Sequence, residues 1–395
     1  MITALAAPRA EPSSRSQPRA RPRPTRAPAP AVAFFRSNGQ TGPLDHDASS
    51  KCRVAESLAR LLGHEFVGEL DLAHPPTGSL YLVPTDTLPT LAEAQRLGIN
   101  RADQLFGGVV PQPFVATKVI SHPLVQPGAC SLPGWSAAYG DQVRDAVLPG
   151  YSVFSAEDAR LAAERLFQGG GVRLKDPAGV GGVGQWVIES LDELDARLAE
   201  IGPQRLMQHG LVLERNLNQV VTHSVGQVVV GAHVASYFGT QGLTRNHRGH
   251  EVYGGSQLTV CRGGFDALLK QPLEPDVCTA VEQALVFHKA TASCFPGFFA
   301  SRCNYDVAQG LDDDGRPLSG VLEQSWRIGG ASGAEAAALH AFAANPTLRR
   351  VQASTCEVYD DAFTLPRGAW LLYDGPDNQG GRLVKYAQVT PDVDA

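Results

Sequence analysis

The chain has 395 residues, of which 43% are hydrophobic and 19% are charged, and its formal net charge at pH 7 is −6. Such a chain is long enough for two or three packed units with substantial hydrophobic cores. No run of apolar residues approaches the length of about 18 that indicates a membrane-spanning helix. The acidic balance argues against a nucleic-acid-binding platform as the main function.

The first 30 residues differ in composition from the rest of the chain. They are rich in Pro, Arg, Ala and Ser, and they hold six arginines against one glutamate. They lack the apolar segment of a secretory signal, and their seven prolines oppose the amphipathic helix of a transit peptide. We therefore expect a disordered basic tail over residues 1–30.

The seven cysteines form no Cys-x-x-Cys pair and are odd in number. This pattern favours free thiols in a reducing compartment, so we expect a cytoplasmic protein. His247 and His250 are close in sequence but lack the context of a zinc site.

Strand and helix patterns alternate over residues 31–115. This alternation predicts an α/β unit with a largely parallel sheet. The expected strands are 31–35, 65–70 and 79–83, and the expected helices are 49–62 and 91–97.

A second unit is expected at 116–210 and a third at 211–395. In the second, Ser155 and Ser190 cap helices that end near residues 167 and 201, and strands are expected at 171–174 and 185–189. In the third, a short antiparallel pair is expected to turn at Gly226. The other expected elements are strands at 211–217, 298–307, 319–324, 355–359, 369–373 and 382–389, and helices at 275–292 and 334–344.

A glycine-rich segment follows Lys175. Its glycines are Gly179, Gly181, Gly182 and Gly184. Glycine backbone N–H groups approach a phosphate without interference from a Cβ atom, and a neighbouring ammonium group shares the phosphate charge. The segment is therefore a candidate nucleotide-binding loop.

Two common nucleotide motifs do not fit this segment. The dinucleotide fingerprint requires a helix at the third glycine, but the residues from Gln185 onward have the apolar, β-branched character of a strand. The Walker-A motif requires Lys and Ser or Thr after the last glycine, but Gln185 and Trp186 stand there. Two interpretations remain, a phosphate-covering flap between antiparallel strands and a glycine-rich surface turn.

Two carboxylates lie on consecutive strands near the end of the chain. Asp306 and Glu323 can face the same side of an antiparallel pair, and Ser325 and Arg327 follow Glu323 at intervals of two. Carboxylate and hydroxyl oxygens suit Mg²⁺, and an arginine beside them suits a phosphoryl group or a carboxylate. The alternative is a solvated polar face of a sheet.

The order of these features resembles the ATP-grasp superfamily over residues 115–345. The resemblance implies a pre-ATP-grasp α/β domain followed by a two-subdomain ATP-grasp fold. It also implies a Mg²⁺- and ATP-dependent ligase that activates a small-molecule carboxylate as an acyl phosphate, which an amine or another nucleophile attacks. The chain as a whole resembles a bacterial family placed among ATP-grasp proteins, a placement that names no substrate.

The resemblance also implies roles for residues of this chain. Lys118 and Lys175 would contact the α- and β-phosphates, and Arg327 would face the γ-phosphate or the substrate. Glu214 would lie near the adenine amino group. The remaining implied nucleotide contacts are Gly179, Gly181, Gly182, Gly184 and Gln185 in the flap and Leu213, Arg215 and Leu217 in the hinge; the implied Mg²⁺ ligands are Asp306, Glu323 and Ser325.

Two positions depart from the family pattern. Ser325 stands where the third metal ligand is usually asparagine, and Val221 stands where a second hinge acid usually holds the ribose, a role left to His223 or Asn218. These departures keep two other functions open, an ATP-binding regulatory protein without ligase turnover and a small-molecule kinase. The polar segment 244–255 is either a further phosphate or substrate contact or a surface loop.

Overall fold

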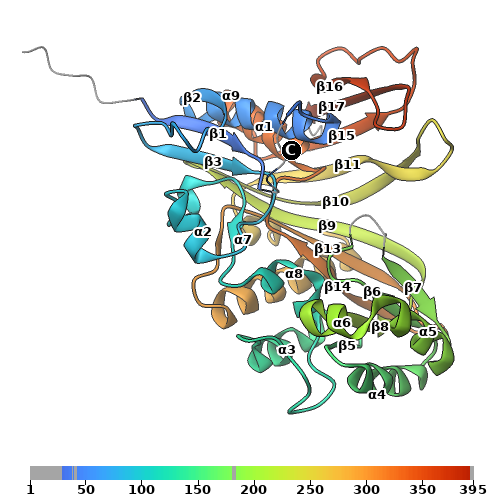
Figure 1. The fold of residues 1–395 in the computed structure, drawn as a ribbon. Coiled ribbons are helices and arrows are strands. Elements are labelled where there is room, and N and C mark those ends of the chain that lie inside the picture. Colours follow the sequence, from blue (N-terminus) through green and yellow to red (C-terminus); the bar gives the residue numbers. More distant parts are fainter. Residues whose placement is uncertain (1–28, 38, 40–41, 180–183, 392–395) are drawn as a thin grey trace, which may run out of the picture.

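The structure is a computed structural model that describes residues 29–37, 39, 42–179 and 184–391. Within these ranges the strands form a three-stranded, a four-stranded and an eight-stranded sheet (Figure 1). A short ladder between β4 (Gly108–Val109) and β12 (Phe299–Ala300) joins the first unit to the last. No helix of the described residues is long and apolar enough to cross a membrane.

The first unit is the predicted parallel α/β layer. Its strands have the order β2-β1-β3, and all five residues of β1 are buried, as expected for a central parallel strand. Its first helix begins three residues before the predicted start, because the Asp45 carboxylate accepts a hydrogen bond from the Ala48 amide at 2.8 Å. The elements are β1 (Ala31–Phe35), α1 (His46–Leu62), β2 (Glu65–Glu69), β3 (Leu80–Pro84) and α2 (Leu91–Arg96).

The four-stranded sheet is antiparallel and has the order β5-β8-β6-β7. Ser155 and Ser190 cap its helices as predicted, and the expected hairpin is formed by β6 and β7. The predicted boundary at 210/211 assigns β8 to the third unit, but β8 is hydrogen-bonded into this sheet. The elements are β5 (Gly150–Val153), α4 (Ala156–Phe167), β6 (Val172–Lys175), β7 (Gln185–Ile188), α5 (Leu191–Ile201), α6 (Pro203–His209) and β8 (Leu211–Arg215).

The eight-stranded sheet holds the rest of the chain in the order β14-β13-β9-β10-β11-β15-β17-β16. Its strands pair antiparallel. Its strands are β9 (Asn218–Val230), β10 (His233–Arg245), β11 (Glu251–Arg262), β13 (Arg302–Leu311), β14 (Pro317–Ser325), β15 (Arg350–Val358), β16 (Trp370–Pro376) and β17 (Arg382–Pro391). Its helices are α7 (Phe265–Leu268), α8 (Pro275–Cys294) and α9 (Ser332–Ala344).

The predicted turn at Gly226 is wrong. Gly226 lies inside the continuous strand β9, opposite Tyr237 on one side and Asn304 on the other. A Cβ at this position would clash with the Tyr237 hydroxyl and the Cys303 carbonyl, so the glycine permits close packing and does not mark a turn. The chain reverses at Gly231, whose φ is +57°.

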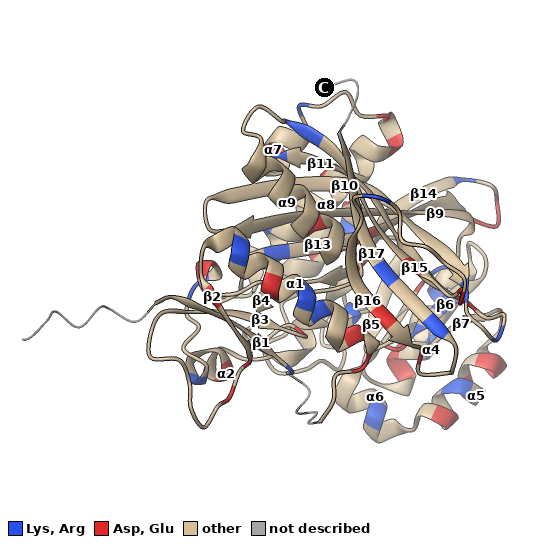
Figure 2. Ribbon diagram, turned by 90° about the horizontal axis from the view of Figure 1, so that it is seen from above, with Lys and Arg blue, Asp and Glu red and all other residues tan. Residues whose placement is uncertain are grey.

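Helices cover both faces of the large sheet. Helix α9 packs with α1 and the first unit against one face, and α8 packs against the other (Figure 1). Seen from above, acidic and basic positions are interspersed along α1 and the neighbouring strands β16 and β17 (Figure 2). The first unit and the large sheet therefore share one hydrophobic core.

Candidate functional site

Asp306 and Glu323 lie directly opposite each other on β13 and β14, and a bulge follows Asp306. Burial raises the pKa of Asp306, and the charge of Glu323 raises it further. Hydrogen bonds to the Asp306 carboxylate oppose this shift only in part, so its pKa is about 6. The structure thus brings together two of the three residues expected to hold a metal, with an unfavourable repulsion between them.

The donors to Asp306 are neutral side chains that the sequence analysis did not single out. They are Asn304 Nδ2 at 3.0 Å, Gln241 Nε2 at 3.1 Å and Ser224 Oγ at 3.2 Å. The position of Asn304, two residues before Asp306 on the same face of β13, is a pattern from which it could have been predicted. Ser224 and Gln241 come from β9 and β10, and strand pairing alone brings them here.

Lys118 connects the glycine segment to the carboxylate pair. It lies in the 3₁₀ turn Lys118–Ser121 and is 5% exposed. Its ammonium group lies 2.8 Å from Glu323 Oε2 and also donates to the carbonyl of Gly179. One lysine therefore contacts both the base of the predicted flap and a predicted metal ligand.

Lys175 lies in a second buried cluster. Its ammonium group forms an ion pair with Glu214, and these side chains are 2% and 1% exposed. The other Glu214 oxygen lies 3.0 Å from His122 Nε2. Burial alone would raise the pKa of Glu214, but the charge of Lys175 and the His122 hydrogen bond outweigh it and lower the pKa to about 2.

Glu214, predicted to lie near the adenine amino group, lines a cavity described below and also has partners within the protein. Both of its carboxylate oxygens already have partners within the protein. Its geometry is that of a group that holds Lys175 in place. The sequence analysis did not identify His122, which stands alone among apolar residues and carries no motif.

A cavity of about 220 Å³ lies between the four-stranded sheet and the β13–β14 edge of the large sheet. Half of its ten lining residues are aliphatic, and the other half are charged or amide side chains. The predicted hinge residue Leu213 is buried in the core of the small sheet and does not line it. The lining residues are Leu148, Arg173, Lys175, Gln185, Glu214, Arg215, Leu217, Val220, Ala308 and Leu322.

The glycine segment is only partly visible. Gly179 and Gly184 close the base of the β6–β7 hairpin, where Gly184 has φ +74° and its carbonyl accepts from Asp176 N at 2.8 Å. Gly181 and Gly182 lie outside the described residues. The hairpin geometry agrees with the flap interpretation and excludes a helix at Gly184.

A larger, polar cavity of about 660 Å³ lies on the other side of the carboxylates. Asp306, Glu323, Ser325 and Arg327 all line it, so the structure brings this predicted set together. Arg36 and Asp86 also line it from the carboxyl ends of β1 and β3. Ligands bind at such strand ends in α/β sheets, a rule that could have identified both residues.

Arg327 is the most available cation of this cavity. Its Nη1 donates to its neighbour's carbonyl, that of Ile328, at 3.3 Å, and its Nε lies 3.7 Å from the exposed Asp86 carboxylate. The separation from Asp86 is too long for a hydrogen bond. The guanidinium can therefore still bind an anionic group in the cavity.

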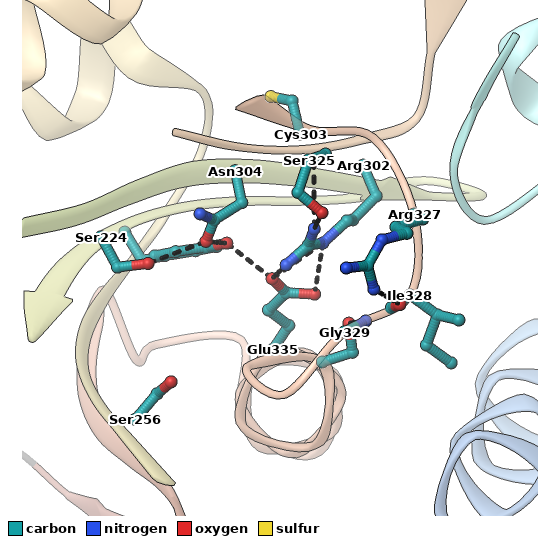
Figure 3. Close-up of polar contacts among 12 residues, drawn as sticks. Ser224, Ser256, Arg302, Cys303, Asn304, Ser325, Arg327, Ile328, Gly329 and Glu335 are labelled. Carbon is teal, nitrogen blue, oxygen red and sulfur yellow. Dashed lines mark hydrogen bonds and ion pairs between the residues drawn. The ribbon is translucent and has the colours of Figure 1, made fainter. Parts of the chain in front are cut away.

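Ser325 lies beside a buried ion pair (Figure 3). Arg302 Nη1 donates to the Ser325 carbonyl at 3.1 Å and to Ser325 Oγ at 3.2 Å. Arg302 is held from its other side by Glu335 of α9, with Nη2–Oε1 at 2.8 Å. The sequence analysis missed this pair because an arginine and a glutamate 33 residues apart form no local pattern.

The residues present suit a Mg²⁺ ion held by few protein ligands. No group of three or more His, Cys, Asp or Glu side chains in the described part of the chain could hold a metal. Asp306 and Glu323 nevertheless supply two hard, adjacent carboxylates whose mutual repulsion a divalent cation would relieve. Mg²⁺ commonly uses one or two carboxylates and takes its other ligands from phosphates and water.

The candidate ribose contacts have partners elsewhere. His223 Nε2 lies 3.0 Å from Gln309 Oε1, and Asn218 Nδ2 donates to Asp313 at 2.9 Å. In the polar segment 244–255, the structure has the β10–β11 hairpin, and His247 Nε2 lies 2.9 Å from the Arg382 carbonyl. Of these residues, only Tyr253 lines either cavity, and it lines the larger one.

Comparison with solved structures identifies the architecture as the ATP-grasp fold. N5-carboxyaminoimidazole synthetase from Staphylococcus aureus is similar over 94% of this chain and 95% of its own, with a TM-score of 0.51 and 13% identity. Its complex with ADP covers the same shares, with a TM-score of 0.50 and 12% identity. Phosphoribosylamine–glycine ligase from Thermotoga maritima aligns over 92% of this chain and 93% of its own, with a TM-score of 0.49 and 14% identity.

Residues 35–387 match the family described as "Protein of unknown function (DUF3182)", and the chain belongs to this family. No curated protein sequence matches it.

Proposed function

We propose that the protein is an ATP- and Mg²⁺-dependent ligase that activates a carboxylate as an acyl phosphate. One observation carries the proposal: both cavities adjoin the strands β13 and β14, and the paired carboxylates line the larger one. Along β13 and β14, Ala308 and Leu322 line the smaller cavity, whereas Asp306 and Glu323 line the larger one. ATP with its base in the smaller cavity would extend its γ-phosphate toward the polar one.

The smaller cavity suits a nucleoside triphosphate. Leu148, Leu217 and Leu322 offer apolar contacts to a planar base, and Lys175 lines the same cavity. Glu214 and His122 hold Lys175 in one position, so little side-chain entropy is lost when it meets a phosphate. The ADP complex of the similar synthetase supports an adenine nucleotide as the ligand.

The carboxylate pair and its neighbours suit phosphoryl transfer. A Mg²⁺ ion held by Asp306 and Glu323 would neutralise charge on the transferred group. Lys118, which contacts Glu323, is close enough to turn toward a phosphate oxygen. Arg327 would orient the acceptor carboxylate in the larger cavity, so the chain contributes mainly positioning and fixed charges.

The proposed reaction has two steps. A substrate carboxylate oxygen attacks the γ-phosphorus, the bond to the β,γ-bridging oxygen breaks, and ADP leaves. An amine then attacks the acyl carbon, the C–O bond to phosphate breaks, and inorganic phosphate leaves while the nitrogen loses a proton. The polar lining and volume of the larger cavity suit a polar small molecule.

Two measurements test the proposal, one of ATP binding and one of ATP turnover. Calorimetry should show Mg²⁺-dependent binding of ATP to the full chain, and fractionated polar metabolites should stimulate release of both ADP and phosphate. A phosphorylated product without phosphate release would instead identify a kinase. ATP binding without any metabolite-stimulated ADP would identify a regulatory protein, and absence of ATP binding would refute the nucleotide site itself.

A further inference from the structure

Arg302 occupies a position beside the carboxylates that no predicted role explains. It is the fourth residue before Asp306 on the chain, and its side chain is 2% exposed while that of Glu335 is 0% exposed. Every guanidinium nitrogen is engaged, with Nε and Nη2 on Glu335 and Nη1 on Ser325 (Figure 3). A buried ion pair with a hydrogen bond at each guanidinium nitrogen is held in one geometry, and it fixes the position of Ser325, which it contacts.

The hydrogen bond from Arg302 determines whether the Ser325 hydroxyl can bind a cation or an anion. An arginine has no acceptor, so Ser325 Oγ accepts the hydrogen bond from Arg302 and its own proton points elsewhere. A divalent cation on the remaining lone pair of Ser325 Oγ would lie next to the guanidinium, which repels it. An anionic oxygen would be attracted by the same arrangement.

The neighbouring amide, that of Asn304, is surrounded by protein groups. Asn304 lies opposite Ser325 in the ladder. Its Oδ1 lies 2.9 Å from Ser224 Oγ and from Tyr237 Oη, and its Nδ2 donates to Asp306. Each hydroxyl has one proton and a second acceptor, Asp306 for Ser224 and Glu335 for Tyr237, so the two hydroxyls lie against the amide oxygen without both donating to it at all times.

We infer that Arg302 prevents Ser325 from acting as a third metal ligand. The site then takes one divalent cation, between Asp306 and Glu323. Ser325 donates its hydroxyl hydrogen bond to the terminal phosphate of the nucleotide. This inference rests on the proposed function. Arg302 acts through Ser325 and is a positioning residue. Glu335 keeps the buried guanidinium in place and links it to α9, next to the larger cavity.

The metal count tests the first half of the inference. Mn²⁺ is titrated into the full chain with a saturating non-hydrolysable ATP analogue, and bound Mn²⁺ is counted by electron paramagnetic resonance. We expect one Mn²⁺ per chain, both in the natural protein and in Ser325→Asn, because the guanidinium remains. In Arg302→Met/Glu335→Gln/Ser325→Asn, which removes the buried charges together, a second Mn²⁺ should bind.

Nucleotide affinity tests the second half. Ser325→Ala should weaken binding of the triphosphate analogue about tenfold, as expected for one hydrogen bond to a charged group. It should leave ADP affinity and the Mn²⁺ count unchanged. Ser319→Ala is the matched control, because Ser319 lies on the same strand, bonds to Gln283 at 2.6 Å and lines neither cavity.

Two Mn²⁺ ions in the natural protein, with one lost in Ser325→Ala, would overturn the inference while leaving the proposed function intact. An unchanged count of one Mn²⁺ in a folded triple variant would also overturn it, with folding checked by circular dichroism. If the natural protein binds neither the analogue nor Mn²⁺, the proposed function fails and the inference fails with it.

Discussion

The two buried clusters at the proposed nucleotide site shift the pKa of a carboxylate in opposite directions. Glu214 has a lysine and a histidine as partners, and its pKa is lowered to about 2 despite burial. Asp306 is equally buried, but its donors are neutral and its neighbour Glu323 is another carboxylate, and its pKa is raised to about 6. The first cluster is complete as it stands, whereas in the second Lys118 pairs with Glu323 and the proposed Mg²⁺ would supply a cation for Asp306.

Removing the counter-charge from the cluster of Lys175, Glu214 and His122 should have the largest effect on stability. Glu214→Ala leaves the buried Lys175 ammonium without a counter-charge, so we expect a loss of about 3–5 kcal/mol in the free energy of unfolding. Chemical denaturation measures it. Glu214→Gln/Lys175→Met removes both charges and should cost clearly less; an equal cost for the two variants would mean that charge pairing does not hold this cluster together.

Removing the charges of the second cluster should mainly damage function. Asp306→Asn/Glu323→Gln should lower ATP-dependent turnover at least about a hundredfold, since it removes the proposed metal ligands. The double variant also leaves the buried Lys118 ammonium without its partner Glu323, so its melting temperature should fall. Asp306→Asn alone removes the like-charge repulsion and keeps that ion pair, so its melting temperature should stay the same or rise. Turnover is followed by ADP release, and calorimetry should show that ATP binding has lost its dependence on Mg²⁺. A double variant that retains Mg²⁺-dependent binding would exclude this pair as the metal site.

Lys118 contacts both Gly179 at the base of the glycine hairpin and Glu323 in the second cluster. Lys118→Met should weaken ATP affinity by roughly tenfold, the value of one charge-assisted contact. Arg205→Met is the matched control, because it removes an exposed cation that pairs with Asp176 near the same hairpin. An equal loss in both variants would mean that general positive charge, and not this contact, supports binding.

The smallest expected effect is a pH dependence of stabilisation by Mg²⁺. A carboxylate whose folded pKa is raised favours the folded state below its unfolded pKa of 3.8, and this contribution is lost as the pH rises through about 6. Mg²⁺ competes with the proton for Asp306, so it should raise the melting temperature more at pH 7.5 than at pH 5, by about 1–3 °C. The difference should vanish in Asp306→Asn, and an unchanged difference there would assign the effect to another group.

The lowered pKa of Glu214 gives a second test of the cluster that it forms with Lys175 and His122. Glu214 has a folded pKa lowered to about 2, so its contribution to stability is present above its ordinary pKa of 4.5 and is lost as the pH falls toward 2. The loss in the free energy of unfolding between pH 5 and pH 2.5 should therefore be smaller in Glu214→Gln/Lys175→Met than in the natural protein. Equal acid profiles would show that this pair does not contribute to the acid sensitivity.

Local patterns predicted most of the elements and part of the site. The caps at Ser155 and Ser190 and the hairpin around the glycine segment depend on neighbours within a few residues, and all are found. The Gly226 turn was wrong because the requirement there comes from Tyr237 and Cys303 on adjacent strands. A glycine needed for close packing has the same appearance in a sequence as a glycine needed for a turn.

The sequence by itself determined which chemical groups this protein has and the order in which they occur: the lysine before the glycine hairpin, and the two carboxylates on consecutive strands. Such groups are recognised from periodicity and spacing, which are local properties. Only the tertiary structure decided their partners. His122 contacts Glu214, and Lys118 contacts Glu323. Arg302 contacts both Ser325 and Glu335. In each case the partners come from distant segments of the chain. Burial and charge act through space, so the folded arrangement sets which carboxylate is already neutralised and which one is left for a cation.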